Sequence, residues 1–228
     1  FVRLFTTKNG SSERTKHQDI CPILETCGQC QLLDLPYKAQ IIHKNTLAKQ
    51  EVKKLGEHFQ NVSIKDCIES VEKLQYKHSV ELVVSEHTST KTEGPTPRRW
   101  VDIGYYRRDI DRVTDIGRCP VQNKSLNDIV AWTRTGIRVH KVSTVSRTTK
   151  NGTLDSIIIN FTRATNQALV TFIGTKNNTS ELRPLACDLV AQFPNIRGVV
   201  FRLKNTSQDA QNPSIQTTKV LAGANTIE

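Results

Sequence analysis

The sequence has no methionine, few aromatic residues and no long apolar run. Aromatic residues make up only 6% of its 228 residues. No stretch approaches the roughly 18 consecutive apolar residues that a membrane-spanning helix needs, which argues against a membrane protein. The apolar start at residues 1–5 is too short for a secretory signal peptide. Because Met is absent even at position 1, we expect the chain to be an internal piece of a longer, cytoplasmic protein.

The sequence also lacks the motifs that mark common active sites. It has no glycine-rich dinucleotide-binding turn, no Walker loop, no nucleophile elbow around a serine and no zinc-protease helix motif. Asp109 and Asp111 lie two residues apart, but they stand among arginines and are typical of solvated ion pairs. We therefore expect no catalytic residue and no organic-cofactor site in this chain.

Positive charge is in excess. Lys and Arg number 32 against 22 Asp and Glu, which gives a net charge of +10. Such an excess favours a polyanion as partner, because Lys and Arg neutralise phosphates and release counterions. An ordinary solvated surface is the alternative. An anionic membrane is a weaker candidate, since no basic amphipathic helix carries an aromatic face.

The six cysteines are unevenly spread. Cys21, Cys27 and Cys30 fall within ten residues, and Gly28 suits a tight loop that turns several thiolates toward one centre. A secreted disulfide scaffold would be shorter and denser in cysteine. The cluster therefore predicts metal ligands, with a redox or incidental Cys-x-x-Cys as the alternative.

The best candidate for a fourth ligand is Cys119, which is followed by proline, as Cys21 is. We expect Cys67 to be a half-buried core residue and Cys187 to face the core from a helix. Four thiolates can hold either tetrahedral zinc or a [4Fe–4S] cluster. A triple-cysteine loop with one remote cysteine is more typical of clusters, although spacing alone leaves zinc open.

The hydrophobic pattern predicts an α+β fold. Apolar spacing predicts helices at residues 37–55, 120–136 and 181–192, the second opened by Pro120 and ended by Gly136, the third capped by Ser180. Strand-like runs, rich in apolar and β-branched residues, predict strands at residues 62–68, 76–85, 99–106, 154–163, 168–173, 199–204 and 217–222. From residue 76 onward the order is β-β-α-β-β-α-β-β, which indicates a mainly antiparallel sheet with helices.

Two basic segments are candidates for nucleic-acid binding. The helix at 37–55 carries a lysine face with Lys44, Lys49 and Lys53, which could follow a phosphate backbone or be a solvated surface. The segment 98–108 interleaves aromatic rings with arginine, a combination that suits stacking on RNA bases. We expect Trp100 to be buried and Tyr106 to bind RNA. The arginines most suited to RNA are Arg107, Arg108 and Arg112.

Together these residues resemble the S-adenosylmethionine-dependent RNA uracil-5-methyltransferases, the family of the 23S rRNA and tRNA m5U enzymes. The resemblance is clear over residues 21–120 and weaker beyond. The motifs that carry it are Cys21-Pro-x4-Cys27-Gly-x-Cys30, Tyr37-x-x-Gln40-x3-Lys44, Tyr76-Lys77, Ile103-Gly104-Tyr105-Tyr106-Arg107-Arg108 and Val113-x-Asp115-Ile116-x-x-Cys119-Pro120.

The resemblance implies a domain order and a ligand set. Residues 1–20 would be the end of a TRAM-like barrel and a linker, 21–75 the cluster loop and basic helix, and 76–228 the central RNA-binding domain. Cys21, Cys27, Cys30 and Cys119 would ligate a [4Fe–4S] cluster, and Tyr76 and Lys77 would join the RNA-binding residues. The Rossmann-like domain that binds S-adenosylmethionine would lie beyond this chain, so the isolated chain would be inactive.

The resemblance also implies a reaction. The complete enzyme, expected to be a monomer, would methylate C5 of a flipped-out uridine in 23S rRNA, with tRNA as the alternative substrate. The reading that competes with it is a stand-alone zinc-containing nucleic-acid-binding module without catalysis.

Overall fold

The computed structural model describes residues 20–56, 62–89, 98–107, 110, 112–146, 149, 151–204 and 218–227. The chain forms two compact units. One contains residues 1–24 and 30–69, and the other contains residues 25–29 and 70–228. The expected TRAM-like segment at 1–20 lies outside the described residues, apart from Ile20. None of the helices in the described ranges is both long enough and apolar enough to cross a membrane.

The first unit is built on helix α2 (Tyr37–Lys54), which confirms the expected helix. The expected strand at 62–68 is wrong, because this segment is irregular and Ile68 is 94% exposed. Instead of pairing with another strand, the segment makes a hydrogen bond and an ion pair with side chains of α2. The Asn45 Oδ1 accepts from the Cys67 backbone N–H at 2.7 Å, and Lys49 lies 3.5 Å from Asp66.

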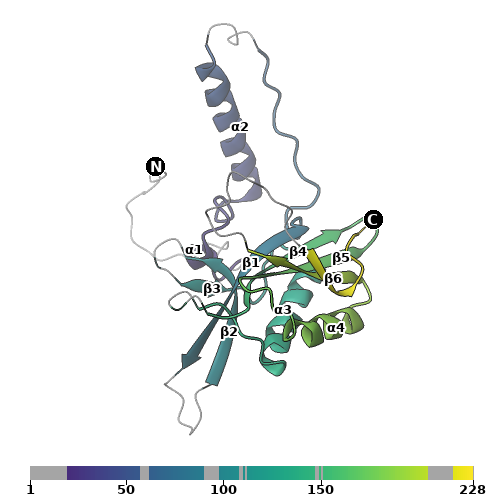
Figure 1. Ribbon diagram of the computed structural model, residues 1–228. Coiled ribbons are helices and arrows are strands. Elements are labelled where there is room, and N and C mark those ends of the chain that lie inside the picture. The colour runs from purple at the N-terminus through teal and green to yellow at the C-terminus, as the bar shows by residue number, and fades with distance from the viewer. Residues whose placement is uncertain are drawn as a thin grey trace. The chain divides into compact units, whose positions relative to one another are not determined.

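The second unit is a seven-stranded sheet with two long helices and the short helix α1 (Figure 1). The strand order is β3-β2-β1-β4-β5-β6-β7, and only the β5–β6 pair is parallel. The expected mainly antiparallel sheet is therefore confirmed. The elements are α1 (Leu24–Cys27), β1 (Ser79–Ser89), β2 (Arg98–Tyr106), β3 (Val113–Asp115), α3 (Lys124–Val139), β4 (Leu154–Thr162), β5 (Gln167–Gly174), α4 (Leu182–Gln192), β6 (Ile196–Leu203) and β7 (Thr218–Gly223).

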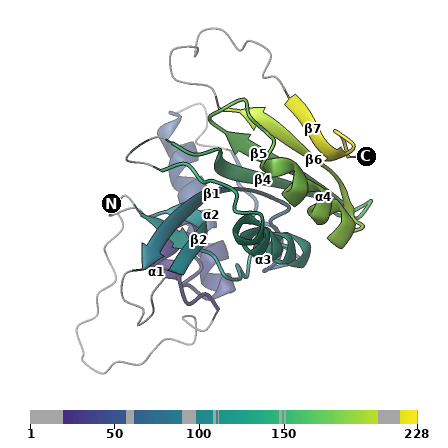
Figure 2. The same ribbon diagram turned by 60° about the horizontal axis from the view of Figure 1, so that its bottom comes forward.

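Helices α3 and α4 lie against one face of this sheet, as Figures 1 and 2 show from two directions. The strands alternate, so that every second residue faces the helices. Apolar side chains from both layers form a core that excludes water. Its largest fully buried members include Leu82, Ile103, Leu126, Ile129, Ile157, Ile159, Phe172, Leu182 and Phe201.

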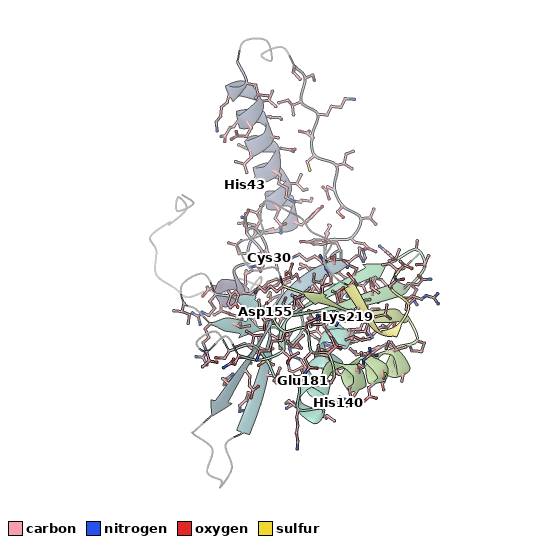
Figure 3. All side chains as sticks on the ribbon, viewed as in Figure 1. Cys30, His43, His140, Asp155, Glu181 and Lys219 are labelled. Carbon is pink, nitrogen blue, oxygen red and sulfur yellow. The ribbon has the colours of Figure 1, made fainter. Side chains whose placement is uncertain are left out.

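Polar contacts tie the two helices to each other and to the loop between α3 and β4. His140 Nε2 lies 2.8 Å from Asp188 Oδ2 on α4. Glu181, just before α4, accepts from the backbone N–H of Ser143 at 2.8 Å and from its hydroxyl at 2.9 Å. Figure 3 labels His140 and Glu181 near the two helices.

The boundaries of α3 and α4 differ from those expected. Pro120 does not open α3; its N-cap is Asn123, whose side-chain oxygen accepts from the Ser125 N–H at 2.9 Å. Gly136 does not end α3 but lies inside it, where a Cβ would come within 2.4 Å of Leu185 Cδ1. Glycine there permits the close approach of α3 and α4. Ser180 does not cap α4, whose N-cap position is Glu181.

Three predictions of burial are wrong. Cys67 is exposed, because its segment forms no strand. Cys187 is exposed although Leu185 and Leu189 are buried, since a residue two positions along a helix points roughly 200° away. Trp100 is 39% exposed because it pairs with His87 on the sheet face opposite the helices.

Candidate nucleic-acid interface and cysteine loop

Cys119 lies in a turn that leads from β3 into α3. The backbone N–H of Gln122 closes this turn by donating to the Cys119 carbonyl at 3.2 Å. Asn127 on α3 is buried, with 8% of its surface exposed, and its side chain hydrogen-bonds the same turn. Its Oδ1 accepts from the Cys119 N–H at 2.9 Å, and its Nδ2 donates to the carbonyls of Cys119 at 3.0 Å and Gln122 at 3.3 Å. The backbone of Cys119 is therefore fixed to the helix.

Tyr76 and Lys77 run beside this turn. The Gln75 N–H donates to the Pro120 carbonyl at 2.9 Å, and the Lys77 N–H donates to the Val121 carbonyl at 2.8 Å. Tyr76 is 48% exposed, and the Lys77 ammonium lies 5.9 Å from the centre of the Tyr105 ring. The fold thus places two expected RNA-binding residues next to an expected cluster ligand, although they are more than 40 positions away in sequence.

Cys27 is tied to the same edge of the sheet. It ends α1, and the preceding residue Thr26 accepts a hydrogen bond through its carbonyl from the Thr114 hydroxyl on β3 at 3.3 Å. Gly28 follows with φ 64°, the left-handed conformation that lets the chain turn sharply. Cys27 and Cys119 therefore both adjoin the edge strand β3.

The expected ligand set is divided between the two units. Cys27 and Cys119 belong to the sheet unit, whereas Cys21 and Cys30 belong to the unit of α2. None of the six cysteines forms a disulfide. Among the residues that the structure describes, no group of three or more His, Cys, Asp or Glu side chains is arranged to hold a metal ion. The four-cysteine site therefore stays a prediction.

Asp115 and Arg134 hold the edge strand β3 in place through hydrogen bonds. Neither role was predicted from the sequence. Asp115 Oδ1 accepts from the Ile103 backbone N–H at 2.9 Å and from Arg134 at 2.7 Å. Arg134, with its side chain 18% exposed, also donates to the Ile116 carbonyl at 2.9 Å. In the sequence, Arg134 stands out only as a charged residue on the otherwise apolar side of a helix. The polar Asn127 on the same side is the corresponding sign of a contact to the Cys119 turn.

The basic candidates fall in both units. Just after β2, the backbone N–H of Arg107 donates to the Arg112 carbonyl at 2.9 Å, which brings these two residues together. Arg108 lies outside the described residues. In the α2 unit, Lys44, Lys49 and Lys53 are exposed. The expected lysine surface is thus accessible, and its use in RNA binding stays a prediction.

A carboxyl group with a shifted pKa lies on β2. Burial raises the pKa of the Asp102 carboxyl above its ordinary value. His87, whose Nδ1 lies 3.1 Å from Asp102 Oδ2, opposes that rise. The pair occupies the sheet face that α3 and α4 leave uncovered.

Curated proteins similar to this chain are named as RNA methyltransferases. One from Geobacter sulfurreducens is 28% identical over 189 residues, which are 83% of this chain and 36% of that protein. One from Gloeobacter violaceus is 28% identical over 209 residues, 91% of this chain and 43% of that protein. The chain is therefore similar to proteins named as RNA methyltransferases over most of its length. It spans about two fifths of the length of these curated relatives. No protein-family model matches it.

A solved structure has a fold similar to that of this chain. The crystal structure of the Pyrococcus abyssi tRNA (uracil-54, C5)-methyltransferase in complex with S-adenosyl-L-homocysteine aligns with a TM-score of 0.57 and 16% sequence identity. The alignment covers 86% of this chain and 41% of the archaeal chain. The α+β arrangement described above is therefore one found within a methyltransferase structure.

Proposed function

We propose that this chain is the cluster-bearing, RNA-binding portion of an RNA methyltransferase that transfers a methyl group from S-adenosylmethionine to C5 of a uridine. The observation that carries the proposal is the similarity to RNA methyltransferases over more than four fifths of the chain. The matching fold of a tRNA uracil-C5 methyltransferase supports the uridine C5 position. We propose 23S rRNA as the substrate, with tRNA as the alternative.

The proposed ligands are Cys21, Cys27, Cys30 and Cys119. Their donor chemistry fits an iron–sulfur cluster, because four cysteine thiolates are the usual ligand set and none of these thiols is used in a disulfide. The Asn127 side chain hydrogen-bonds the backbone of Cys119, and hydrogen bonds of this kind fix the orientation of a metal ligand. When bound, a cluster would supply structural cross-linking, since metal-binding free energy adds to folding free energy.

The chain's own residues would bind and position RNA. Tyr76 and Tyr106 are 48% and 37% exposed and offer rings on which unpaired bases can stack. Lys77, Arg107, Arg108, Arg112 and the lysines of α2 would contact phosphates, which hold the RNA in register without reading its sequence. Because the sequence has no motif for S-adenosylmethionine, methyl transfer would require the rest of the enzyme.

Anaerobic purification of the chain tests the cluster. We expect a brown protein with iron and acid-labile sulfide, and loss of both when Cys119 is replaced by serine. A colourless protein with stoichiometric zinc would instead support the stand-alone zinc module.

Incubation with labelled S-adenosylmethionine and unmodified rRNA tests whether the chain alone can transfer a methyl group. We expect the chain to bind the RNA and to transfer no label. Label in C5 of uridine would show that the chain contains its own methyl-donor site.

A further inference from the structure

A pocket opens on the sheet face opposite α3 and α4. Its volume is about 440 Å³, within the range of about 300–1,000 Å³ found for small-ligand sites. It crosses five neighbouring strands from β2 to β6, and all of its lining residues belong to the sheet unit. No feature of the sequence drew attention to it, because its residues come from segments far apart in the chain.

The floor of the pocket is aliphatic. Val83 on β1 pairs with Ser156 on β4, which pairs with Ile173 on β5, and Ile158 lies beside them on the same face. Partly exposed aliphatic side chains at the bottom of a pocket favour a flat apolar ligand. Tyr106, 37% exposed at the end of β2, adds an aromatic wall.

The two ends of the pocket differ in charge. Glu81 on β1 is exposed beside the Tyr106 end, and Arg202 on β6 lies at the other end. Strands β1 and β6 are separated by β4 and β5, so these backbones are roughly 14 Å apart. Long side chains that reach inward from both ends can span one nucleotide.

The cation at the basic end is available. Lys204 Nζ lies 2.6 Å from Asp155 Oδ2, so this pair neutralises itself; Asp155 is labelled in Figure 3. Among the described residues, no ion pair or hydrogen bond involves the side chain of Arg202. An arginine in this position suits a phosphate.

We propose that this pocket holds one unpaired nucleotide of the bound RNA. The base stacks against Tyr106 over the floor of Ile158 and Ile173, and the phosphate binds Arg202. The Glu81 carboxylate accepts a hydrogen bond from an exocyclic amino group, which selects cytosine, adenine or guanine over uracil. The nucleotide is therefore a different one from the uridine that is methylated. This inference rests on the proposed function, because it requires that the chain binds RNA.

The test measures binding of an RNA hairpin whose loop contains all four bases, together with versions in which one loop base at a time is removed. For the wild-type chain, removal of one particular base should weaken binding about tenfold, as expected for the loss of one stacked base. Tyr106→Ala should weaken binding of the intact hairpin by a similar factor, and the two losses should not add. Tyr106→Phe keeps the ring and should bind like the wild type.

Matched variants separate the pocket from general electrostatics. Arg202→Ala should weaken binding severalfold, whereas Arg183→Ala, at an exposed position on α4, should leave it unchanged. Glu81→Gln should change the base preferred at the coupled position, and this readout stands even where Tyr106→Ala fails to fold.

Three results would overturn the proposal in distinguishable ways. Additive losses at every loop position, or a Glu81→Gln variant with unaltered base preference, would show that the pocket holds no nucleotide while RNA binding itself stands. Absence of hairpin binding by the folded wild-type chain would overturn the proposed function as well.

Discussion

Asn127 shows how much a single buried side chain does near Cys119. It lies on the core side of α3 and makes three hydrogen bonds to the backbone of the turn that carries the cysteine. A buried amide with its donors and acceptor satisfied stabilises one conformation, whereas its removal leaves the partner groups unpaired. Asn127 therefore determines where the Cys119 backbone lies.

The first prediction concerns this clamp. Asn127→Ala should lower the free energy of unfolding by about 2–3 kcal/mol, because it leaves backbone groups of Cys119 and Gln122 without partners. Chemical denaturation measures the change. Thr135→Ala, at an exposed position of the same helix, should shift it by less than about 0.5 kcal/mol. Equal effects of the two substitutions would show that the hydrogen bonds of Asn127 contribute nothing to the free energy of unfolding.

The second prediction compares two cysteines. Cys119→Ser should remove iron and lower the melting temperature, since it deletes a proposed cluster ligand. Cys187→Ser should change neither property, because Cys187 is an exposed thiol on α4. Iron analysis and thermal unfolding of both variants check this. Equal iron content and equal melting temperatures would reject Cys119 as a ligand.

Strand β3 is the element on which the cysteine region depends. It is only three residues long, and it adjoins both α1 and the Cys119 turn. Its pairing with β2 requires Gly104, which lies opposite Asp115. A Cβ at Gly104 would lie 1.8 Å from the Thr114 carbonyl oxygen, so the two strands can approach only because residue 104 has no side chain.

The third prediction follows from this contact. Gly104→Ala should destabilise the chain by about 3 kcal/mol, because a backbone atom cannot move aside as a side-chain end can. Gly117→Ala is the matched control, since a Cβ there meets nothing within 4 Å. Its unfolding free energy should stay within about 0.5 kcal/mol of the wild type. Hydrogen exchange of the β3 amides would show whether Gly104→Ala detaches this strand alone.

Elements with a clear apolar period were predictable, and those without one were not. Strands β4 and β5 and the turn between them are predictable because each is a short run rich in apolar and β-branched residues. A short polar segment in which Asn166 has φ 53° joins them. Strand β3 is not predictable from the sequence, because three residues are too few to show an alternation of apolar and polar side chains. The segment 62–68 alternates like a strand, yet it pairs with no strand among the described residues, and Asn45 accepts a hydrogen bond from the Cys67 backbone N–H instead.

At the scale of the whole molecule, excess positive charge is the property that bears on the partner. A net charge of +10 attracts polyanions, such as the proposed RNA, at long range, and the attraction weakens as salt screens it. Phosphate contacts made by individual Lys and Arg residues should then appear in the salt dependence of binding. Charge alone does not say which face is used.

The fourth prediction tests one face. Replacement of both Arg107 and Arg108 by Ala should weaken RNA binding severalfold at moderate salt and reduce the slope of log affinity against log salt by about two. The loss should be similar for all RNA sequences. Replacement of both Arg138 and Arg183, which are exposed on the two helices, should leave binding unchanged. An unchanged slope in the first variant would place the RNA elsewhere.

The sequence by itself determined the α+β class, the mainly antiparallel sheet, the main helices and the resemblance to RNA methyltransferases. These follow from local period, from turn residues and from motifs that are contiguous in the chain, so no knowledge of distant contacts is needed. The candidate ligands could be named for the same reason, because three of the four cysteines lie within ten residues.

The tertiary structure decided which distant residues meet. It placed Tyr76 and Lys77 beside the Cys119 turn, Asn127 against the backbone of Cys119, and residues of five strands around one pocket. It also exposed Trp100 and Cys187, both of which sequence reasoning had buried. Strand register and helix rotation fix these outcomes, and both depend on packing between elements that are far apart in the chain.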